Sequence, residues 1–188
     1  MTEQVYETER LRIRHWTKSD AQRLFEIYSH PAVWEHIPEL RVQRLEEAGP
    51  RLTHLAATYR RYGPGLGVWA ALRKSDELVV GTVMLKNIPD GDQQLTAEIE
   101  VGWHLARDCW GQGYATEMAQ GALRHGFQQK NLDRIIAVTH AENVGSEAVM
   151  KRLGMSHRGL TQAYYGEELV LYELQLEQWR ALESARAD

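Results

Sequence analysis

Residues 98–117 constrain the fold more than any other stretch, because their hydrophobic pattern changes period in the middle. From 98 to 105, charged or polar residues alternate with apolar ones, which is the period of a strand. From 115 onward, small and apolar residues recur at helical spacing. Gly111 and Gly113 lie between the two patterns. The stretch therefore predicts a strand, a glycine-containing loop and a helix in succession.

A strand, a glycine loop and a helix N-terminus form an arrangement that holds anions, because backbone N–H groups point out of the first helical turn. The phosphate loop of ATPases needs Lys-Ser/Thr after its last glycine, whereas Tyr114 and Ala115 follow Gly113. The dinucleotide fingerprint needs a small residue where Thr116 stands. A glycine-containing turn without any ligand is the remaining simple alternative.

Two motifs carry a resemblance to a known family. Residues 110–115, Trp-Gly-Gln-Gly-Tyr-Ala, resemble the Gln/Arg-x-x-Gly-x-Gly/Ala signature of the GNAT (Gcn5-related N-acetyltransferase) superfamily, with Trp110 as a departure at the first position. With an aromatic residue at this position, the run Trp-Gly-x-Gly-Tyr-Ala-Thr-Glu resembles the RimJ/RimL-like branch of ribosomal-protein N-terminal acetyltransferases. Residues 143–155, which run from Asn143-x-x-Ser146 to Lys-Arg-Leu-Gly-Met, resemble the second GNAT motif, with Met155 in place of phenylalanine.

Length and composition bound the class of protein. The chain has 188 residues, enough for one domain with a sizeable core. A net charge of −4 argues against a nucleic-acid partner. The single cysteine, Cys109, fits a reducing compartment, and neither a signal peptide nor a membrane-length apolar run is present, so we expect a cytoplasmic protein. The histidines show no metal-ligand spacing, so we expect no metal.

The patterns predict the element order. Strands are expected at 8–16, 68–73, 78–86, 98–105, 134–140, 155–160 and 168–176. Helices are expected from 21 to before His30, at 42–62 with an interruption at Gly49-Pro50, at 113–130 and at 147–153. Thr17 to Asp20 predicts a capping box. The apolar run 134–140 predicts a parallel strand joined to its predecessor by a helix.

The fold class is therefore predicted as α+β, with a single domain at 8–179 and terminal tails at 1–7 and 180–188. The resemblance implies a GNAT fold, in which a mixed, mainly antiparallel central sheet is flanked by helices and the fourth and fifth strands splay apart. The gap between those two strands takes the pantetheine arm of acetyl-CoA in the family.

The resemblance also implies which residues bind acetyl-CoA. The main chain of the central strand would pair with the pantetheine arm, with an N–H near Val101 to Trp103 as a candidate oxyanion donor. The glycine loop would hold the pyrophosphate, and Asn143 would bond the pantetheine arm or simply cap a helix. The full set of cofactor-binding candidates is Trp103, His104, Leu105, Trp110, Gly111, Gln112, Gly113, Tyr114, Ala115, Thr116, Asn143, Ser146 and Lys151.

Catalytic candidates come from the same strand and from the C-terminal half. Glu98 and Glu100 share one face of the predicted strand, and burial would raise the pKa of such a carboxyl toward a value suited to a general base. Glu100 matches a glutamate of the RimJ/RimL-like branch; it could instead face solvent or pair with an arginine such as Arg107, and His104 is a second candidate base. The resemblance implies Ser146 or Tyr164, with Tyr165 as an alternative, as the proton donor to the thiolate.

The sequence thus predicts an enzyme that moves an acetyl group from acetyl-CoA directly to a primary amine in a ternary complex. The acceptor is expected to be either a protein N-terminus or a small molecule, and the protein a monomer or homodimer without a membrane partner. A CoA-binding sensor or scaffold without catalysis is the alternative class. An NTP-binding module is a third class, which the absence of Lys-Ser/Thr after Gly113 disfavours.

Overall fold

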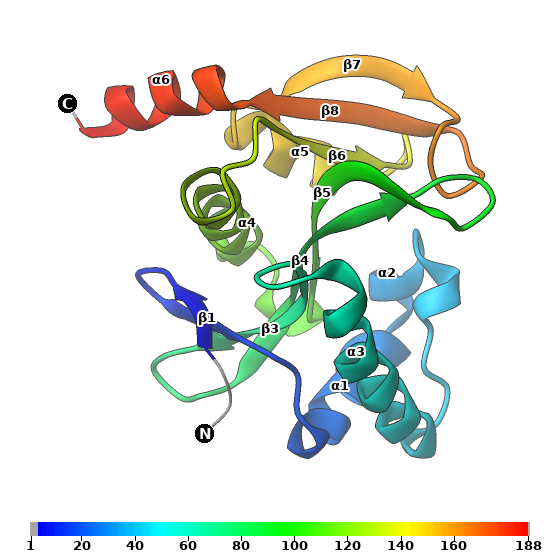
Figure 1. The fold of residues 1–188 in the computed structure, drawn as a ribbon. Coiled ribbons are helices and arrows are strands. Elements are labelled where there is room, and N and C mark those ends of the chain that lie inside the picture. Colours follow the sequence, from blue (N-terminus) through cyan, green and yellow to red (C-terminus); the bar gives the residue numbers. More distant parts are fainter. Residues whose placement is uncertain (1–3, 188) are drawn as a thin grey trace. The chain divides into compact units, whose positions relative to one another are not determined.

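A computed structural model describes residues 4–187, with the backbone alone for Arg60 and Ala187. The chain forms two compact units. The first runs to Met84 and includes Trp103–Gly121, and the second comprises Leu85–Gly102 and the chain from Ala122 onward. Strands β4 (Val79–Pro89) and β5 (Leu95–Leu105) and helix α4 (Tyr114–Arg124) run through both units (Figure 1).

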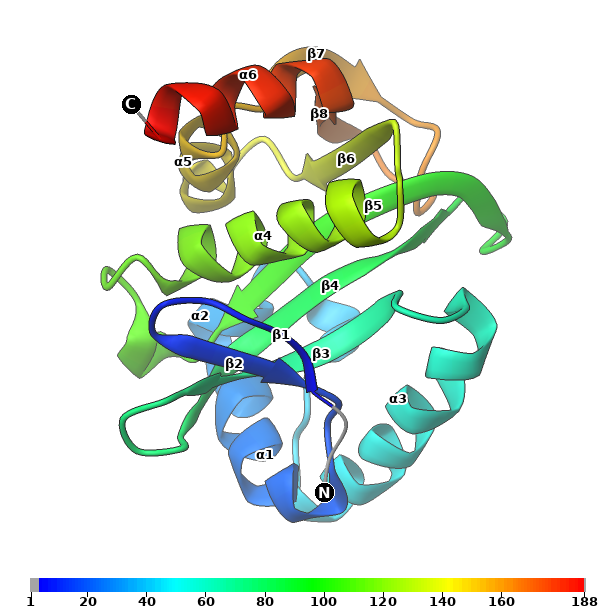
Figure 2. The same ribbon diagram turned by 60° about the vertical axis from the view of Figure 1, so that its left-hand side comes forward.

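The first unit combines an antiparallel set of strands with three helices. Its strand order is β1-β2-β3-β4, with Arg14 of β2 opposite Ala70 of β3. Helices α1 and α3 contact each other, and α3 packs against β3. Both helices lie below β3 in Figure 2. Apart from β4, its elements are β1 (Gln4–Glu7), β2 (Leu11–Arg14), β3 (Gly67–Arg73), α1 (Ala21–Ser29), α2 (Pro31–Trp34), α3 (Ala48–Tyr62) and the 3₁₀ turns η1 (Lys18–Asp20), η2 (Pro38–Leu40), η3 (Leu45–Glu47) and η4 (Arg107–Cys109).

Local sequence signals explain how α1 begins and correct one prediction about α3. The expected capping box is confirmed, with Thr17 N–H donating to Asp20 Oδ2 over 2.7 Å. The prediction that Gly49 and Pro50 divide the second helical stretch was wrong, because both lie in the first turn of α3. N–H groups of a first turn have no acceptor within the helix, so a proline there removes no hydrogen bond.

The second unit contains the parallel strand pair. Its strand order is β4-β5-β6-β8-β7, and β5 pairs with β6 in parallel with Glu100 opposite Ile136, so the predicted strand–helix–strand unit is confirmed. β6 pairs with β8 and β8 with β7 in antiparallel fashion. Its further elements are a π-helical turn (His125–Gln129), β6 (Arg134–Thr139), α5 (Val144–Arg152), β7 (Ser156–Thr161), β8 (Leu169–Gln175) and α6 (Leu176–Ala187).

Both ends of the chain, expected to be tails, form regular elements in the described residues. At the N-terminal end, Gln4 of β1 lies opposite Arg14 of β2. At the C-terminal end, Trp179 of α6 is buried and stacks on Phe127 at 5.2 Å between ring centroids. Helix α6 begins inside the predicted domain, at Leu176, and continues through the predicted tail to Ala187. No helix within residues 4–187 has the length and apolar character needed to cross a membrane.

Candidate active site

The glycine loop between η4 and α4 has a backbone that requires its glycines. Gly111 has φ +74° and Gly113 has φ +81°, in the left-handed region that L side chains rarely adopt. A Cβ at Gly113 would lie 3.4 Å from Arg10 Nη2, whereas a Cβ at Gly111 would meet nothing within 4 Å. Gly111, Gln112 and Gly113 are exposed. The loop is therefore exposed and turns sharply just before α4 begins.

Backbone donors of this loop are available to an outside acceptor. The N–H of Glu117 donates to the carbonyl of Gly113 over 3.1 Å, which begins the hydrogen bonding of α4. Among the described residues, no hydrogen bond is recorded from the N–H groups of Gly111, Gln112 or Gly113. The first helical N–H groups after them lack acceptors by geometry, and the helix dipole is positive there. This arrangement suits a pyrophosphate.

Arg10 supports the loop, and the sequence analysis missed it. Its guanidinium donates from Nη1 to the carbonyl of Gln112 over 3.0 Å and from Nε to Glu117 Oε2 over 2.6 Å. The same guanidinium lies 4.5 Å from the ring centre of Tyr114. Arg10 reads in the sequence as one of several polar residues of the first strand. No local signal reveals a contact with a loop about a hundred residues away, because only the fold brings the two together.

Trp110, which replaces the signature's Gln or Arg, folds back along the chain. Its Nε1 donates to the carbonyl of Leu105 over 3.0 Å, and the Arg107 guanidinium lies 4.8 Å from its ring centre. Arg107 is therefore beside Trp110. Cys109, next to Trp110, is buried, and burial raises the pKa of its thiol. A thiol in that state is a poor nucleophile at neutral pH.

The end of β5 in the first unit holds Trp103, His104 and Leu105, all partly buried. The Nδ1 of His104 and the hydroxyl of Tyr28 are hydrogen-bonded at 3.0 Å, and the tautomer decides which one donates. The Tyr28 hydroxyl also lies 2.8 Å from Thr82 Oγ1. His104, the second candidate base, is thus tied to the interior of the first unit.

The beginning of β5 in the second unit carries the two glutamates, and their surroundings differ. Glu100 is 4% exposed, and its Oε1 accepts hydrogen bonds from Lys86 Nζ and from the hydroxyl of Tyr165. Lys86 Nζ also donates to the Tyr165 hydroxyl over 3.0 Å. Glu98 forms an ion pair with Arg134 and is about a third exposed. Glu100 therefore neither faces solvent nor pairs with Arg107; it belongs to a buried Lys86–Glu100–Tyr165 cluster.

Tyr165, rather than Tyr164, reaches Glu100. The backbone of Tyr165 has φ +58°, unusual for a residue with a side chain, and its N–H donates to the carbonyl of Pro89 over 3.2 Å. Burial, followed by the nearby charge of Glu98, raises the pKa of Tyr164. Both tyrosines are partly buried, and the sequence Tyr-Tyr-Gly gives no local sign that Tyr165 is the one in contact with Glu100.

Asn143 precedes α5 and Ser146 lies in its first turn, and both belong to the second unit. Asn143 Oδ1 accepts the N–H of Ser146 over 3.1 Å, which makes Asn143 the N-cap of α5. Lys151 is exposed and donates to Glu147 over 2.9 Å. The capping role of Asn143 is therefore observed, and a cofactor role for Asn143, Ser146 and Lys151 stays a prediction. Across the described residues, no group of three His, Cys, Asp or Glu side chains is placed to hold a metal ion.

Fold and sequence agree on the class of protein. Solved acetyltransferases share the fold: a GNAT acetyltransferase from Bacillus anthracis matches with TM-score 0.73 and 25% identity, over 91% of this chain and 98% of that one. RimL, a ribosomal alpha-N-protein acetyltransferase in complex with coenzyme A, matches with TM-score 0.73 and 16% identity, over 94% of this chain and 99% of that one.

Sequence comparison identifies the family. The profile of the acetyltransferase (GNAT) domain matches residues 10–156. The uncharacterized N-acetyltransferase YnaD of Bacillus subtilis (strain 168) is 31% identical over 81% of this chain and 82% of its own length. The chain belongs to the GNAT acetyltransferase family.

Proposed function

We propose that the protein transfers an acetyl group from acetyl-CoA directly to a primary amine, in a ternary complex. The observation that carries the proposal is the open loop at Gly111 to Gly113, whose N–H groups have no recorded acceptor among the described residues and lie at the start of α4. The GNAT family membership supports acetyl-CoA as the donor. In this reading the loop holds the pyrophosphate, and the main chain of residues 103–105 pairs with the pantetheine arm.

Bound acetyl-CoA supplies the thioester whose C–S bond breaks as the amine nitrogen forms the new C–N bond. Glu100 takes one proton from the acceptor's ammonium, so that the neutral amine can attack the thioester carbon. The nitrogen gives up its second proton when the tetrahedral intermediate collapses. Lys86 and Tyr165, which both donate to Glu100 Oε1, fix the orientation of this carboxylate. The departing thiolate takes a proton from a hydroxyl, and the candidates are Ser146, Tyr164 and Tyr165. Tyr165 is the one that the structure places against Glu100.

Release of the CoA thiol tests the proposal, with acetyl-CoA and a panel of small amines and peptides with free N-termini. Glu100→Gln should lower kcat by about 100-fold or more, since general base catalysis contributes about 10²–10⁴-fold. Glu98→Gln is the matched control on the same strand and should retain most activity. Thermal melting of both variants separates a catalytic loss from unfolding, because Glu100→Gln removes the carboxylate that carries the counter-charge of Lys86.

Two results would contradict the proposal. Equal activity of Glu100→Gln and wild type would remove Glu100 as the base. Acetyl-CoA binding without transfer to any amine of the panel would favour the alternative, a CoA-binding sensor or scaffold that does not catalyse.

A further inference from the structure

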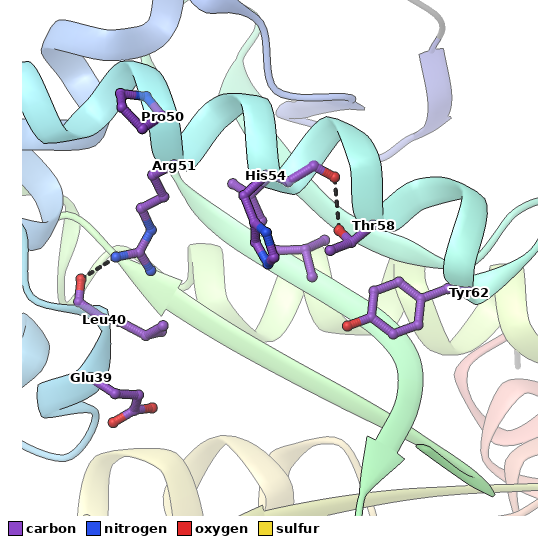
Figure 3. Close-up of a pocket in the computed structure, with 9 residues that line it drawn as sticks. Glu39, Leu40, Pro50, Arg51, His54, Thr58 and Tyr62 are labelled. Carbon is purple, nitrogen blue, oxygen red and sulfur yellow. Dashed lines mark hydrogen bonds between the residues drawn. The ribbon is translucent and has the colours of Figure 1, made fainter. Parts of the chain in front are cut away.

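One face of α3 lines a pocket in the first unit. The pocket has a volume of about 520 Å³, within the range of small-molecule sites. Side chains three or four positions apart on α3 line it: Arg51, His54, Leu55, Thr58 and Tyr62. Residues of η2 and β3 contribute the other walls, including Glu39, Leu40 and Val68. Figure 3 shows Arg51, His54 and Tyr62 extending from the same side of the helix.

Arg51 shares this pocket with one carboxylate, Glu39, whose charge opposes the effect of burial on the pKa of Arg51. Its Nη1 donates to the carbonyl of Leu40, and its guanidinium lies 4.5 Å from the ring centre of Tyr28. Within residues 4–187, no ion pair of Arg51 is recorded, whereas Arg14 pairs with Asp20 and Arg23 pairs with both Glu26 and Asp108. Burial lowers the pKa of Arg51, which reflects a charge removed from water. A guanidinium has five N–H donors, so most of its hydrogen-bonding capacity is left for a ligand.

Tyr28 connects this guanidinium to the strand expected to hold acetyl-CoA. The ring of Tyr28 contacts Arg51, and its hydroxyl is hydrogen-bonded to His104 Nδ1 at 3.0 Å. His104 lies in the segment 103–105, whose main chain is the proposed partner of the pantetheine arm. All three residues belong to the first unit. An acceptor in the pocket would therefore lie next to the residues that contact this strand.

We propose that the α3 pocket binds the acetyl acceptor as a small amine that also carries a carboxylate, and that Arg51 holds this carboxylate. This inference rests on the proposed acetyl transfer. A carboxylate matches the fork of a guanidinium and would supply a counter-charge in direct contact with it. Leu55, Val68 and the ring of Tyr62 offer apolar surface for the carbon part of the acceptor. Arg51 thus acts as a specificity residue that binds the carboxylate of the acceptor.

Binding of matched ligands to the full chain tests the pocket directly. N-acetyl-leucine and N-acetyl-leucinamide both mimic an acetylated product and differ in one carboxylate, and calorimetry compares their Kd values. Wild type should bind the acid about tenfold more tightly than the amide, since hydrogen bonds to a charged group are the stronger ones. Arg51→Gln should remove this preference, and Arg51→Lys should keep part of it.

Two further variants keep the test independent of any folding defect in Arg51→Gln. Arg61→Gln removes an exposed arginine of the same helix that does not line the pocket, and it should bind like wild type. Glu39→Gln removes the exposed carboxylate that lines the pocket and should tighten binding of the acid about twofold, because like charges repel. Equal affinity for acid and amide, no binding of the acid by folded wild type, or an acid preference that survives in Arg51→Gln would overturn the proposal.

Failure of this inference and failure of the proposed function give different results. If acetyl-CoA binds and amines are acetylated but acids are not preferred, the acetyltransferase stands and the role of Arg51 is refuted. If the acid binds through Arg51 but acetyl-CoA does not bind, the pocket stands as a carboxylate site and acetyl transfer is refuted. With both intact, leucine should be a better acceptor than leucinamide, with the difference in KM rather than kcat.

Discussion

The loops that lead into α4 and α5 differ in whether a side chain caps the N-terminus of the helix that follows. Before α5, Asn143 places its own Oδ1 on the N–H of Ser146, so the chain satisfies the helix end by itself. Before α4, Gly111 and Gly113 occupy left-handed conformations, and no side chain is recorded on the N–H groups of the loop among the described residues. A side-chain cap occupies N–H donors at the helix N-terminus, whereas an uncapped N-terminus at an exposed loop leaves those donors to bind an anion.

The largest expected effect comes from filling the open loop. Gly113→Glu adds a carboxylate and a side chain at φ +81°, so the affinity for acetyl-CoA should fall by about 100-fold or more, as expected when a like charge faces the pyrophosphate. Gly159→Glu is a matched control, because Gly159 also has positive φ and a Cβ there meets nothing within 4 Å. Calorimetry with acetyl-CoA measures both. Equal losses in the two variants would mean that backbone strain, and not the loop, is responsible.

Glu117 in the first turn of α4 gives the next largest effect, on stability. Burial alone would raise its pKa, but hydrogen bonds from Thr8 and Arg10 outweigh burial and lower it. Because the folded pKa lies below the unfolded one, the carboxylate stabilises the fold above about pH 4.3 and loses this contribution as pH falls. Glu117→Gln should therefore reduce the free energy of unfolding by about 2 kcal/mol at neutral pH.

Urea unfolding of Glu117→Gln and wild type at several pH values checks the sign. The difference between the two proteins should shrink as pH falls through the folded pKa of Glu117. A difference that stays constant down to pH 3 would show that lost packing, and not the charge, causes the destabilisation.

Asn143 tests the closed loop before α5. Asn143→Ala removes the cap and should lower the free energy of unfolding by about 1 kcal/mol. Asn143→Asp keeps an oxygen for the N–H of Ser146 but loses the amide donor, so it separates capping from cofactor binding. If the Asn143 amide also donates to the pantetheine arm, Asn143→Asp should retain stability and bind acetyl-CoA several-fold more weakly, by about 1 kcal/mol. Unchanged affinity in both variants would leave Asn143 with its capping role alone.

The smallest effect is expected at Lys151, which is exposed and paired with Glu147. If Lys151 contacts acetyl-CoA, Lys151→Ala should weaken binding about threefold at low salt, since exposed charge pairs contribute little. The loss should disappear at high salt, which calorimetry at two ionic strengths would reveal. A salt-independent loss would point to a cause other than charge.

Local signals in the sequence predicted the parts of the fold that depend on neighbouring residues. The change of period around Gly111, the capping box at Thr17 and the apolar run of β6 are each visible within a few consecutive residues. Pro50 misled the prediction for α3, because a proline in a first turn and one in mid-helix look alike until the helix start is known.

The contacts that define the candidate site could not be predicted in the same way. Sequence identified Glu100 as a candidate base, but its partners Lys86 and Tyr165 come from β4 and from a loop beyond β7, and only the fold brings them together. The sequence left the choice between Tyr164 and Tyr165 open, and the fold brings Tyr165 to Glu100. In the sequence, Arg10 and Arg51 look like ordinary polar positions of a strand and a helix. Only the folded structure shows what they contact.

The most direct test of the open loop as the acetyl-CoA site is amide chemical-shift mapping by NMR during an acetyl-CoA titration. The account predicts large shifts for the amides of Gly111, Gln112 and Gly113 and for the first turn of α4. The Ser146 amide, already bonded to Asn143, should shift less. Saturable binding that leaves the Gly111 to Gly113 amides unmoved, or no binding by the folded protein, would contradict the account.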